Sequence, residues 1–333
     1  MNEIVVSVIC NTYNHEKYVR DALESFVAQK TNFEYEILVH DDASTDGTAD
    51  IIREYEGKYP NLIKPIYQTE NQYSKGVLVG ITYQYPRAKG KYIALCEGDD
   101  YWIDLLKLQK QVDYMESHPD CTFCFTNGFI EDQSQLDMIR TPFIPYNDQD
   151  RFFYKDEDQN YDLNNSYQMT FVPTASFLYR KDTYMYVSNF FVGKCPTGDL
   201  RIRLYLTSQG YAHYICDKTC VYRQNVPESA MSRWKKYDRK KVYSHNELIL
   251  TMLRNLDGFT DGKFHDGIVK IENGYIKNLL FSAASVKVLK TKQYKTVYDN
   301  LTVIEKMKFW IKIITPEFFI KCFRKLKNTR KGK

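Results

Sequence analysis

The sequence lacks any apolar run near the roughly 20 residues that a membrane-spanning helix requires, so we expect no transmembrane segment. We also expect no secretory signal, because Asn2 and Glu3 lead into a strand-like segment instead of an apolar helix. No internal repeat, low-complexity tract or nucleic-acid-binding module is evident, which argues against a nucleic-acid partner. We expect the 333 residues to fold as one or two globular domains in the cytoplasm.

Cysteine is not arranged as a disulfide framework, and the six histidines form no cluster. The eight cysteines are spread over positions 10, 96, 121, 124, 195, 216, 220 and 322, and several lie inside apolar, strand-like runs. That placement indicates reduced thiols in the core. Cys121 and Cys124 have a C-x-x-C spacing, and Cys216 and Cys220 form a second pair, so a zinc site is the alternative. It is the weaker alternative, because neither pair has the turn-forming residues of a zinc knuckle.

The N-terminal part alternates short apolar runs with polar turns and amphipathic segments. Residues 5–10 are typical of a buried strand, and apolar residues between 19 and 27 then fall at helical spacing. A second strand at 36–40 runs into the polar segment 41–48, and a second helical segment follows. This order predicts an α/β fold with a mostly parallel, Rossmann-like sheet flanked by helices. Such sheets bind ligands at the carboxyl ends of their strands, where these polar turns lie.

Three carboxylates crowd the turn that follows another strand-like run at 92–95. They belong to Glu97, Asp99 and Asp100. Like charges so close raise one another's pKa, an arrangement that makes sense if a divalent cation binds there. Mg²⁺ and Mn²⁺ prefer oxygen ligands and usually share one or two protein carboxylates with substrate phosphates. We therefore interpret this turn as a Mn²⁺ or Mg²⁺ site. A solvated acidic turn is the alternative.

Several segments together resemble a known family. They are VSVI (6–9), TYN (12–14), DDASTDGT (41–48), NQYSKG (71–76), GKYIALCEGDD (90–100) and TGD (197–199). In this order they are similar to the non-processive family 2 glycosyltransferases, which have the GT-A fold, over roughly residues 4–225. The resemblance implies an inverting, metal-dependent enzyme that moves a sugar from a nucleotide diphosphate donor, here UDP-linked, to an acceptor hydroxyl.

The resemblance also implies which residues hold the nucleotide. Thr12, Tyr13, Asn14 and Asp41 correspond to donor-binding positions. The Asp41 carboxylate would accept a hydrogen bond from a uracil-type ring N–H. For Thr12 and Tyr13, turn formation and core packing are the alternative. The rest of the second loop is expected to order itself and cap the second helix through three polar side chains, Asp42, Ser44 and Asp46.

The remaining donor contacts are implied in two later segments. Asn71 and Lys75 correspond to further donor-binding positions, although Lys75 could equally be a solvated loop residue. Asp99 and Asp100 correspond to the acidic motif that binds ribose and metal. Glu97 stands where many relatives have Asp, so a carboxylate is retained there.

Asp199 resembles the general base of the family. It would take the proton of the acceptor hydroxyl while that oxygen attacks the anomeric carbon. Apolar residues after it predict a helix, and a helix N-terminus favours the ionised carboxylate that a base requires. The alternative is that Asp199 only caps this helix. Asp182 and Asp217 are weaker candidates for the base, and Gln224 stands where relatives often have a histidine.

We expect a GT-A catalytic domain at 1–230, with a donor half at 1–127 and an acceptor half at 128–230. Residues 131–164 are typical of an insertion or long loop near the acceptor side. A helical C-terminal region at 237–333 is expected to follow.

Basic residues concentrate at 306–333, which hold ten Lys or Arg against one Glu. This segment is therefore +9 in a chain of net charge +4, so residues 1–305 carry 4 − 9 = −5. Aromatic and aliphatic residues lie between the charges, a pattern typical of helices on an anionic membrane surface. Packing of the tail on the protein is the alternative. The tail and the resemblance together predict a peripheral protein at the inner face of the cell membrane, with a saccharide or lipid-linked acceptor.

Two other functions stay open on the sequence alone. A nucleotidyltransferase would share the sheet and a metal-bound diphosphate, but it would normally have a glycine-rich, basic loop after the first strand. Residues 11–14 are neither glycine-rich nor basic. The second alternative is a binding module that keeps the nucleotide site without turnover.

Overall fold

The computed structural model of the chain describes residues 3–135, 139–145, 157–169, 171–185, 197–227, 229–283 and 286–315. The chain divides into two compact units. The first comprises residues 1–192 and 198–233, and the second comprises residues 193–197 and 234–333. Part of the expected insertion at 131–164 and the tail beyond residue 315 lie outside the described residues.

The first unit is built on one mixed sheet. Its strands are β1 (Ile4–Thr12), β2 (Glu34–Asp41), β3 (Ile63–Tyr67), β4 (Tyr92–Leu95), β5 (Tyr101–Trp102), β6 (Cys121–Asp132), β7 (Arg140–Pro142), β8 (Gln159–Tyr161), β9 (Leu178–Arg180) and β10 (Tyr211–Gln224). The order along the sheet is β3-β2-β1-β4-β9-β6-β10-β5, while β7 pairs with β6 and β8 with β10. The neighbours from β3 to β4 are parallel, and β9 is antiparallel to both β4 and β6. The predicted mostly parallel α/β sheet is confirmed in this part.

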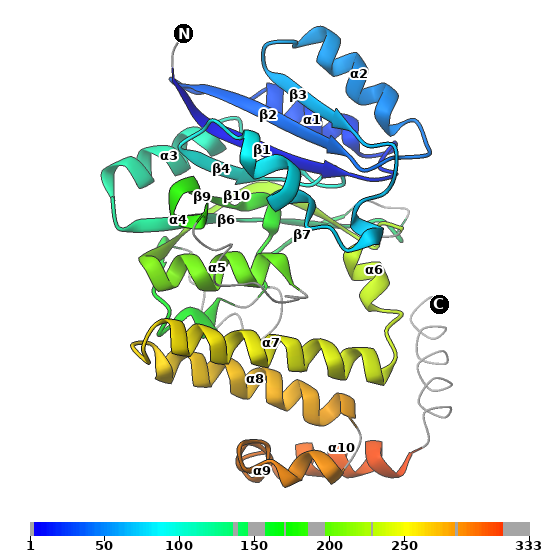
Figure 1. Cartoon of the computed structure of the whole chain (residues 1–333), viewed down its shortest axis with the longest axis vertical. Helices are drawn as coiled ribbons and strands as arrows, with labels where there is room; N and C mark the ends of the chain where they lie inside the picture. Colours follow the sequence, from blue (N-terminus) through cyan, green and yellow to red (C-terminus); the bar gives the residue numbers. More distant parts are fainter. Residues whose placement is uncertain are drawn as a thin grey trace. The chain divides into compact units, whose positions relative to one another are not determined.

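Helices cover both faces of this sheet (Figure 1). The helices of the unit are α1 (Val19–Val27), α2 (Thr48–Lys58), α3 (Lys107–Ser117), α4 (Lys181–Met185), α5 (Gly198–Gln209) and α6 (Ala230–Trp234). Helix α1 buries Val19, Ala22, Leu23 and Phe26, whose spacing places them on one side of a helix. With residues of α2 and α3 they pack against one sheet face, and α5 packs against the other.

Strand β1 explains why two cores form. Successive side chains of a strand point to opposite faces. Val8 accordingly lies in the core beneath α1, whereas its neighbour Ile9 lies in the core on the α5 side. Both are buried, as expected for a central parallel strand whose two faces are covered.

The second unit is helical. Its helices are α7 (Arg239–Phe259), α8 (His265–Ala283), α9 (Lys292–Asp299) and α10 (Val303–Ile314). Helix α7 begins after Asp238, whose carboxylate accepts a hydrogen bond from the Lys241 backbone N–H at 2.8 Å. Helices α7 and α8 run side by side (Figure 1). Within the described ranges, no helix combines the length and the hydropathy that crossing a membrane requires.

Candidate functional site

The carboxyl ends of the parallel strands bring the polar turns together at one edge of the sheet. Thr12 at the end of β1 is in register with Asp41 at the end of β2, and the Asp42 N–H donates to the Thr12 carbonyl at 2.9 Å. The turn after β4 joins the same edge, because the Gly98 N–H donates to the Asn11 carbonyl at 3.0 Å. The turns at residues 11–12, 41–42 and 98 are thus far apart in sequence but neighbours in space.

The acidic turn after β4 is a cluster of like charges. Asp99 and Asp100 are 8% and 5% exposed, whereas the Glu97 side chain reaches solvent. Desolvation by the nearby protein still raises the pKa of the Glu97 carboxyl to about 7, and the charges of Asp99 and Asp199 add to the rise. Burial and the Asp99 charge also raise the pKa of Asp100. Both shifts have the direction expected for carboxylates placed together without a cation.

Asp199 joins this cluster from a distant part of the chain. It is the second residue of α5, and its charge acts on Glu97. The guanidinium of Arg233, from α6, is the positive charge that opposes the rise in the pKa of Glu97. Arg233 lies 4.7 Å from the ring centroid of Tyr73, in the loop after β3. The structure therefore gathers residues from three polar turns, α5 and α6 around the acidic turn.

Arg223 near the end of β10 holds the acidic turn from behind. Its backbone N–H donates to the Asp100 carboxylate at 2.8 Å, and its guanidinium donates to the Asp99 carbonyl at 3.2 Å. The guanidinium also pairs with Asp21 of α1 and lies 3.7 Å from the Glu131 carboxylate. The Arg223 side chain is only 7% exposed. It thus places a buried positive charge directly behind the carboxylates.

The donor set of the acidic turn fits a hard divalent cation only in part. Glu97, Asp99 and Asp100 offer oxygen ligands, which suit Mn²⁺ and Mg²⁺. One Asp100 oxygen already accepts the Arg223 N–H. In the part of the chain that the structure describes, no three Asp, Glu, His or Cys side chains converge to enclose a metal ion. The turn therefore suits a cation that takes one or two protein ligands and completes its shell from elsewhere.

The residues expected near the nucleotide base form a tightly bonded pair of loops. The Asp41 carboxylate accepts a 2.5 Å hydrogen bond from the Ser44 hydroxyl, and the Thr12 hydroxyl lies 3.3 Å from the His40 carbonyl. Asn14 has a φ of 56°, and its side-chain oxygen accepts the Thr45 N–H at 2.8 Å. Asp41 and Thr12 are almost fully buried, while Tyr13 is half-buried. A contact from any of these residues to a donor stays a prediction.

The loop after β3 is also held by local bonds. The Asn71 side-chain oxygen accepts the Ser74 N–H at 2.7 Å, and the Lys75 ammonium pairs with Glu70. Lys75 is exposed. Because it pairs with Glu70, its charge already has a partner before any donor binds. The role of both residues in donor binding likewise stays a prediction.

The expected capping of the second helix is wrong for Asp42. Its carboxylate instead reaches the loop after β3, where it accepts the N–H groups of Gln72 and Tyr73 at 2.8 and 3.0 Å. The residue that precedes α2 is Gly47, which has no side chain to cap the helix, but the Asp46 carboxylate accepts the N–H of Thr48, the first residue of α2, at 3.0 Å. Asp42 therefore ties two loops of the site together, an arrangement that depends on strand order and not on local sequence.

Two residues of the site, His15 and Arg223, were not anticipated. His15 follows the TYN motif, and its Nε2 lies 3.9 Å from an Asp99 carboxylate oxygen. Gly98 leaves space beside it, because a Cβ at position 98 would lie 2.4 Å from the Thr12 Cγ2 and 3.0 Å from the His15 Nδ1. Neither the proximity of His15 nor the role of Arg223 has a signal in the local sequence pattern.

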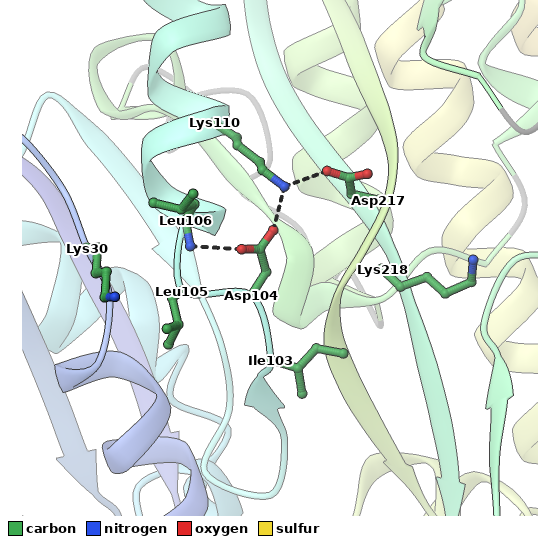
Figure 2. A pocket seen from close by; sticks show the side chains of 8 residues that line it. All are labelled: Lys30, Ile103, Asp104, Leu105, Leu106, Lys110, Asp217 and Lys218. Carbon is green, nitrogen blue, oxygen red and sulfur yellow. Dashed lines mark hydrogen bonds and ion pairs between the residues drawn. The ribbon is translucent and has the colours of Figure 1, made fainter.

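Cys10 and Cys96 lie near the acidic turn, whereas Asp217, a weaker candidate for the base, lines a separate pocket. All six cysteines in the described ranges are free thiols, five of them buried. Asp217 lines an open pocket of about 490 Å³ where it pairs with Lys110 at 2.6 Å (Figure 2). Lys110 also pairs with Asp104 at 2.8 Å in that pocket. The carboxylate of Asp217 is thus engaged, and the acidic turn is absent from the residues that line this pocket.

The chain resembles known proteins in sequence. A sequence model described as glycosyl transferase family 2 matches residues 7–186. The putative teichuronic acid biosynthesis glycosyltransferase TuaG of Bacillus subtilis is 35% identical over 158 residues, which cover 47% of this chain and 56% of TuaG. The Escherichia coli UDP-Glc:alpha-D-GlcNAc-diphosphoundecaprenol beta-1,3-glucosyltransferase WfaP is 35% identical over 127 residues, 38% of this chain and 47% of WfaP. The chain spans only 33% to 56% of the length of curated relatives that it matches.

Solved structures share the fold over most of the chain. S. aureus TarS 1–349 in complex with UDP-GlcNAc aligns with a TM-score of 0.56 and 18% identity, over 92% of this chain and 78% of that one. The mannosyltransferase PcManGT from Pyrobaculum calidifontis, in complex with GDP-Man and Mn²⁺, aligns with a TM-score of 0.50 and 15% identity, over 93% and 86% of the two chains. At such identities the likeness concerns the fold, and the expected GT-A fold is confirmed.

Proposed function

Because the chain belongs to glycosyl transferase family 2, we propose that it transfers a sugar from a nucleotide diphosphate donor to an acceptor hydroxyl with inversion. The observation that carries this proposal is the approach of Asp199, at the N-terminus of α5, to Glu97 of the acidic turn. A carboxylate suited to proton abstraction is then close enough for its charge to act on a carboxylate of the proposed cation site. The UDP-GlcNAc complex of the structurally similar TarS supports a UDP-linked donor.

In this proposal the loops after β1, β2 and β3 hold the nucleotide. Thr12, Tyr13, Asn14 and Asp41 line the base side, and Asn71 and Lys75 contribute from the third loop. The Asp41 carboxylate would offer the base N–H a lone pair that its bond to Ser44 does not use. Lys75 would have to exchange its contact with Glu70 for one with the donor.

The acidic turn would hold Mn²⁺ or Mg²⁺ through Asp99, Asp100 and Glu97. A bound cation supplies charge neutralisation for the diphosphate as it leaves. Asp99 would also accept a hydrogen bond from the ribose. The Mn²⁺ in the complex of PcManGT supports a divalent cation. The identity of the ion is part of the proposal, and the oxygen donors of the turn suit either one.

Asp199 would act as the general base. It lies in the first turn of α5, where the helix dipole attracts negative charge. It would take the proton of the acceptor hydroxyl as that oxygen attacks the anomeric carbon, while the diphosphate leaves from the opposite face. That geometry inverts the anomeric configuration.

The acceptor that we propose is a saccharide carried on a lipid. The name of WfaP describes a diphosphoundecaprenol-linked acceptor, which supports this class. We also propose that the chain works as a peripheral protein at the inner face of the membrane. The +9 charge of residues 306–333 would draw it to anionic lipids, at about 1 kcal/mol for each basic residue near the surface.

A thermal-shift screen of nucleotide sugars, with and without Mn²⁺, tests the donor and the cation together. The proposal expects stabilisation by a UDP-sugar that is larger when Mn²⁺ is present. No stabilisation by any nucleotide sugar under either condition would overturn the donor assignment.

Replacing Asp199 separates transfer from binding. Asp199→Asn is expected to lower the transfer rate by about 10²–10⁴-fold, while UDP-sugar affinity stays within a few-fold. Unchanged transfer would exclude Asp199 as the base. If the unmodified protein binds the donor but neither transfers nor hydrolyses the sugar, the binding-module alternative is correct. The family assignment leaves the nucleotidyltransferase alternative without support.

A further inference from the structure

Helix α10 of the second unit exposes an unusual amount of apolar surface. Six of its side chains are at least 41% exposed: Val303, Ile304, Met307, Trp310, Ile311 and Ile314. With 3.6 residues per turn, these six positions fall within an arc of about 120°. They form one continuous apolar stripe, which we call the α10 face. Ile314 and Val303, at the two ends of the helix, are the most exposed, at 76% and 75%.

The opposite side attaches α10 to its own unit. Phe309 is fully buried and packs against the Tyr298 ring of α9, with 5.2 Å between the centroids. The Lys312 ammonium donates to the Phe281 carbonyl at 3.1 Å, and Glu305 pairs with Lys277 at 2.6 Å. The helix is therefore held in one rotational setting that turns the α10 face away from these contacts.

The start of α10 is also well defined. Thr302 and Glu305 form a capping box, in which each side chain accepts the backbone N–H of the other residue, at 3.3 and 3.0 Å. A helix that begins at one residue keeps a constant phase, so its six apolar side chains stay on the same stripe. The exposure of the α10 face is thus a consequence of both its cap and its packing.

The charges around the α10 face favour one kind of partner. On the helical wheel Lys306 and Lys308 lie on either side of the apolar arc. The single acidic residue of the helix, Glu305, is already paired with Lys277. An apolar stripe bordered by lysines matches the boundary between acyl chains and anionic headgroups, where the stems of lysines extend along apolar surface. A second copy of the chain would instead bring the same lysines together.

We propose that α10 lies in the plane of an anionic bilayer with its apolar face buried below the headgroups. This proposal rests on the membrane association suggested above, and it is independent of the sugar-transfer reaction. It differs from attraction by the basic tail alone, because apolar burial persists when salt screens the charges. The partner is therefore the lipid surface itself, recognised by both acyl chains and anionic headgroups.

Vesicle co-sedimentation of the full chain tests the α10 face. The vesicles contain either phosphatidylcholine alone or a mixture with phosphatidylglycerol, at 0.1 and 0.5 M NaCl. Ile311→Glu places a charge in the stripe, and Val286→Glu makes the same charge change at another exposed apolar position of the unit. We expect Ile311→Glu to weaken binding to the anionic vesicles at least tenfold and Val286→Glu to change it less than twofold. Part of the wild-type binding should survive 0.5 M NaCl.

Three outcomes would overturn the proposal. If both variants bind as the wild type does, the lipid contact lies outside α10, although membrane association survives. If the wild type binds no vesicles, both proposals about the membrane fail, while transfer to a soluble acceptor can still be measured. If light scattering finds a dimer that Ile311→Glu dissociates, a second copy covers the α10 face. Trp310 adds a direct readout: its emission should shift to shorter wavelength on anionic vesicles, and Trp310→Phe should remove that shift.

Discussion

Replacing Arg223 by Met should loosen the acidic turn. The substitution keeps much of the side-chain volume but removes the guanidinium, which contacts the Asp99 carbonyl, Asp21 and Glu131. The guanidinium also lies 4.4 Å from the ring centroid of Tyr101. The hydrogen bond from the Arg223 backbone N–H to the Asp100 carboxylate does not depend on the side chain. The variant therefore removes one support of the turn and leaves the other.

The magnitude depends on which groups lose their partner. The Glu131 side chain is 5% exposed, but it keeps the Tyr101 hydroxyl at 2.7 Å and Arg140 at 2.9 Å. Asp21 is half exposed and can be solvated, so its loss is small. The main losses are the hydrogen bond to the Asp99 carbonyl and the cation–π contact with the Tyr101 ring. Together they should lower the free energy of unfolding by about 3 kcal/mol. Side chains behind a metal site also typically contribute 10–100-fold to its affinity.

Two measurements and a matched control separate these effects. Urea unfolding gives the stability, and titration calorimetry gives the affinity for UDP in the presence of Mn²⁺. Arg180 is the control, because it donates to the carbonyls of Cys121 and Met115 at 2.9 and 2.6 Å. In the sheet Arg180 is opposite Tyr92 at the start of β4, whereas the acidic turn follows the end of that strand. Arg180 therefore supports the same sheet without contacting the acidic turn.

We expect Arg223→Met and Arg180→Met to lose similar stability, and only Arg223→Met to lose at least tenfold in affinity. The conservative Arg223→Lys should restore part of the affinity, because it returns the charge without the planar fork. Equal losses of affinity in the two Met variants would refute the positioning role of Arg223.

Three further predictions concern buried residues. Burial lowers the pKa of His213 from its ordinary value of 6.5 to about 4, so between these two pH values the unfolded chain binds one more proton than the folded chain. The free energy of unfolding should therefore fall by about 2 kcal/mol as the pH drops through this window. His213→Gln should remove this pH dependence when urea unfolding is measured across the same range. Burial lowers the pKa of Lys107, which is 0% exposed, to about 8, so its charge costs stability at pH 7. Lys107→Met should therefore stabilise by about 1–2 kcal/mol by calorimetry, after the loss of its 2.7 Å bond to Gln111, and a destabilised variant would contradict this sign. Gly98→Ala should cost about 2 kcal/mol and weaken UDP binding, because its Cβ would meet Thr12; an unchanged melting temperature would show that the loop can yield.

Much of the catalytic fold could be predicted from local pattern. Apolar, β-branched residues indicate a strand and helical spacing indicates a helix, so residues 5–10 and 19–27 were assigned from their own composition. Parallel strands then bring their carboxyl ends to one edge, and this rule alone placed the loops with Asp41 and Asp99 together. The acidic turn could be interpreted because three carboxylates without basic neighbours are costly unless something compensates them.

Contacts that depend on long-range packing could not be predicted in this way. Asp42 bonds to the loop after β3 instead of capping α2, because strand order decides which loops touch. Lys75 is paired with Glu70, which spacing alone does not reveal. The sequence thus determined the strand–turn–helix order, the acidic turn and the amphipathic character of residues 303–314, since each of these depends on neighbours along the chain. Only the tertiary structure decided that Asp199 and Arg223 meet that turn, because these contacts join residues about a hundred or more positions apart. Only the tertiary structure decided that the α10 face stays exposed, because that depends on which side of the helix its own unit covers.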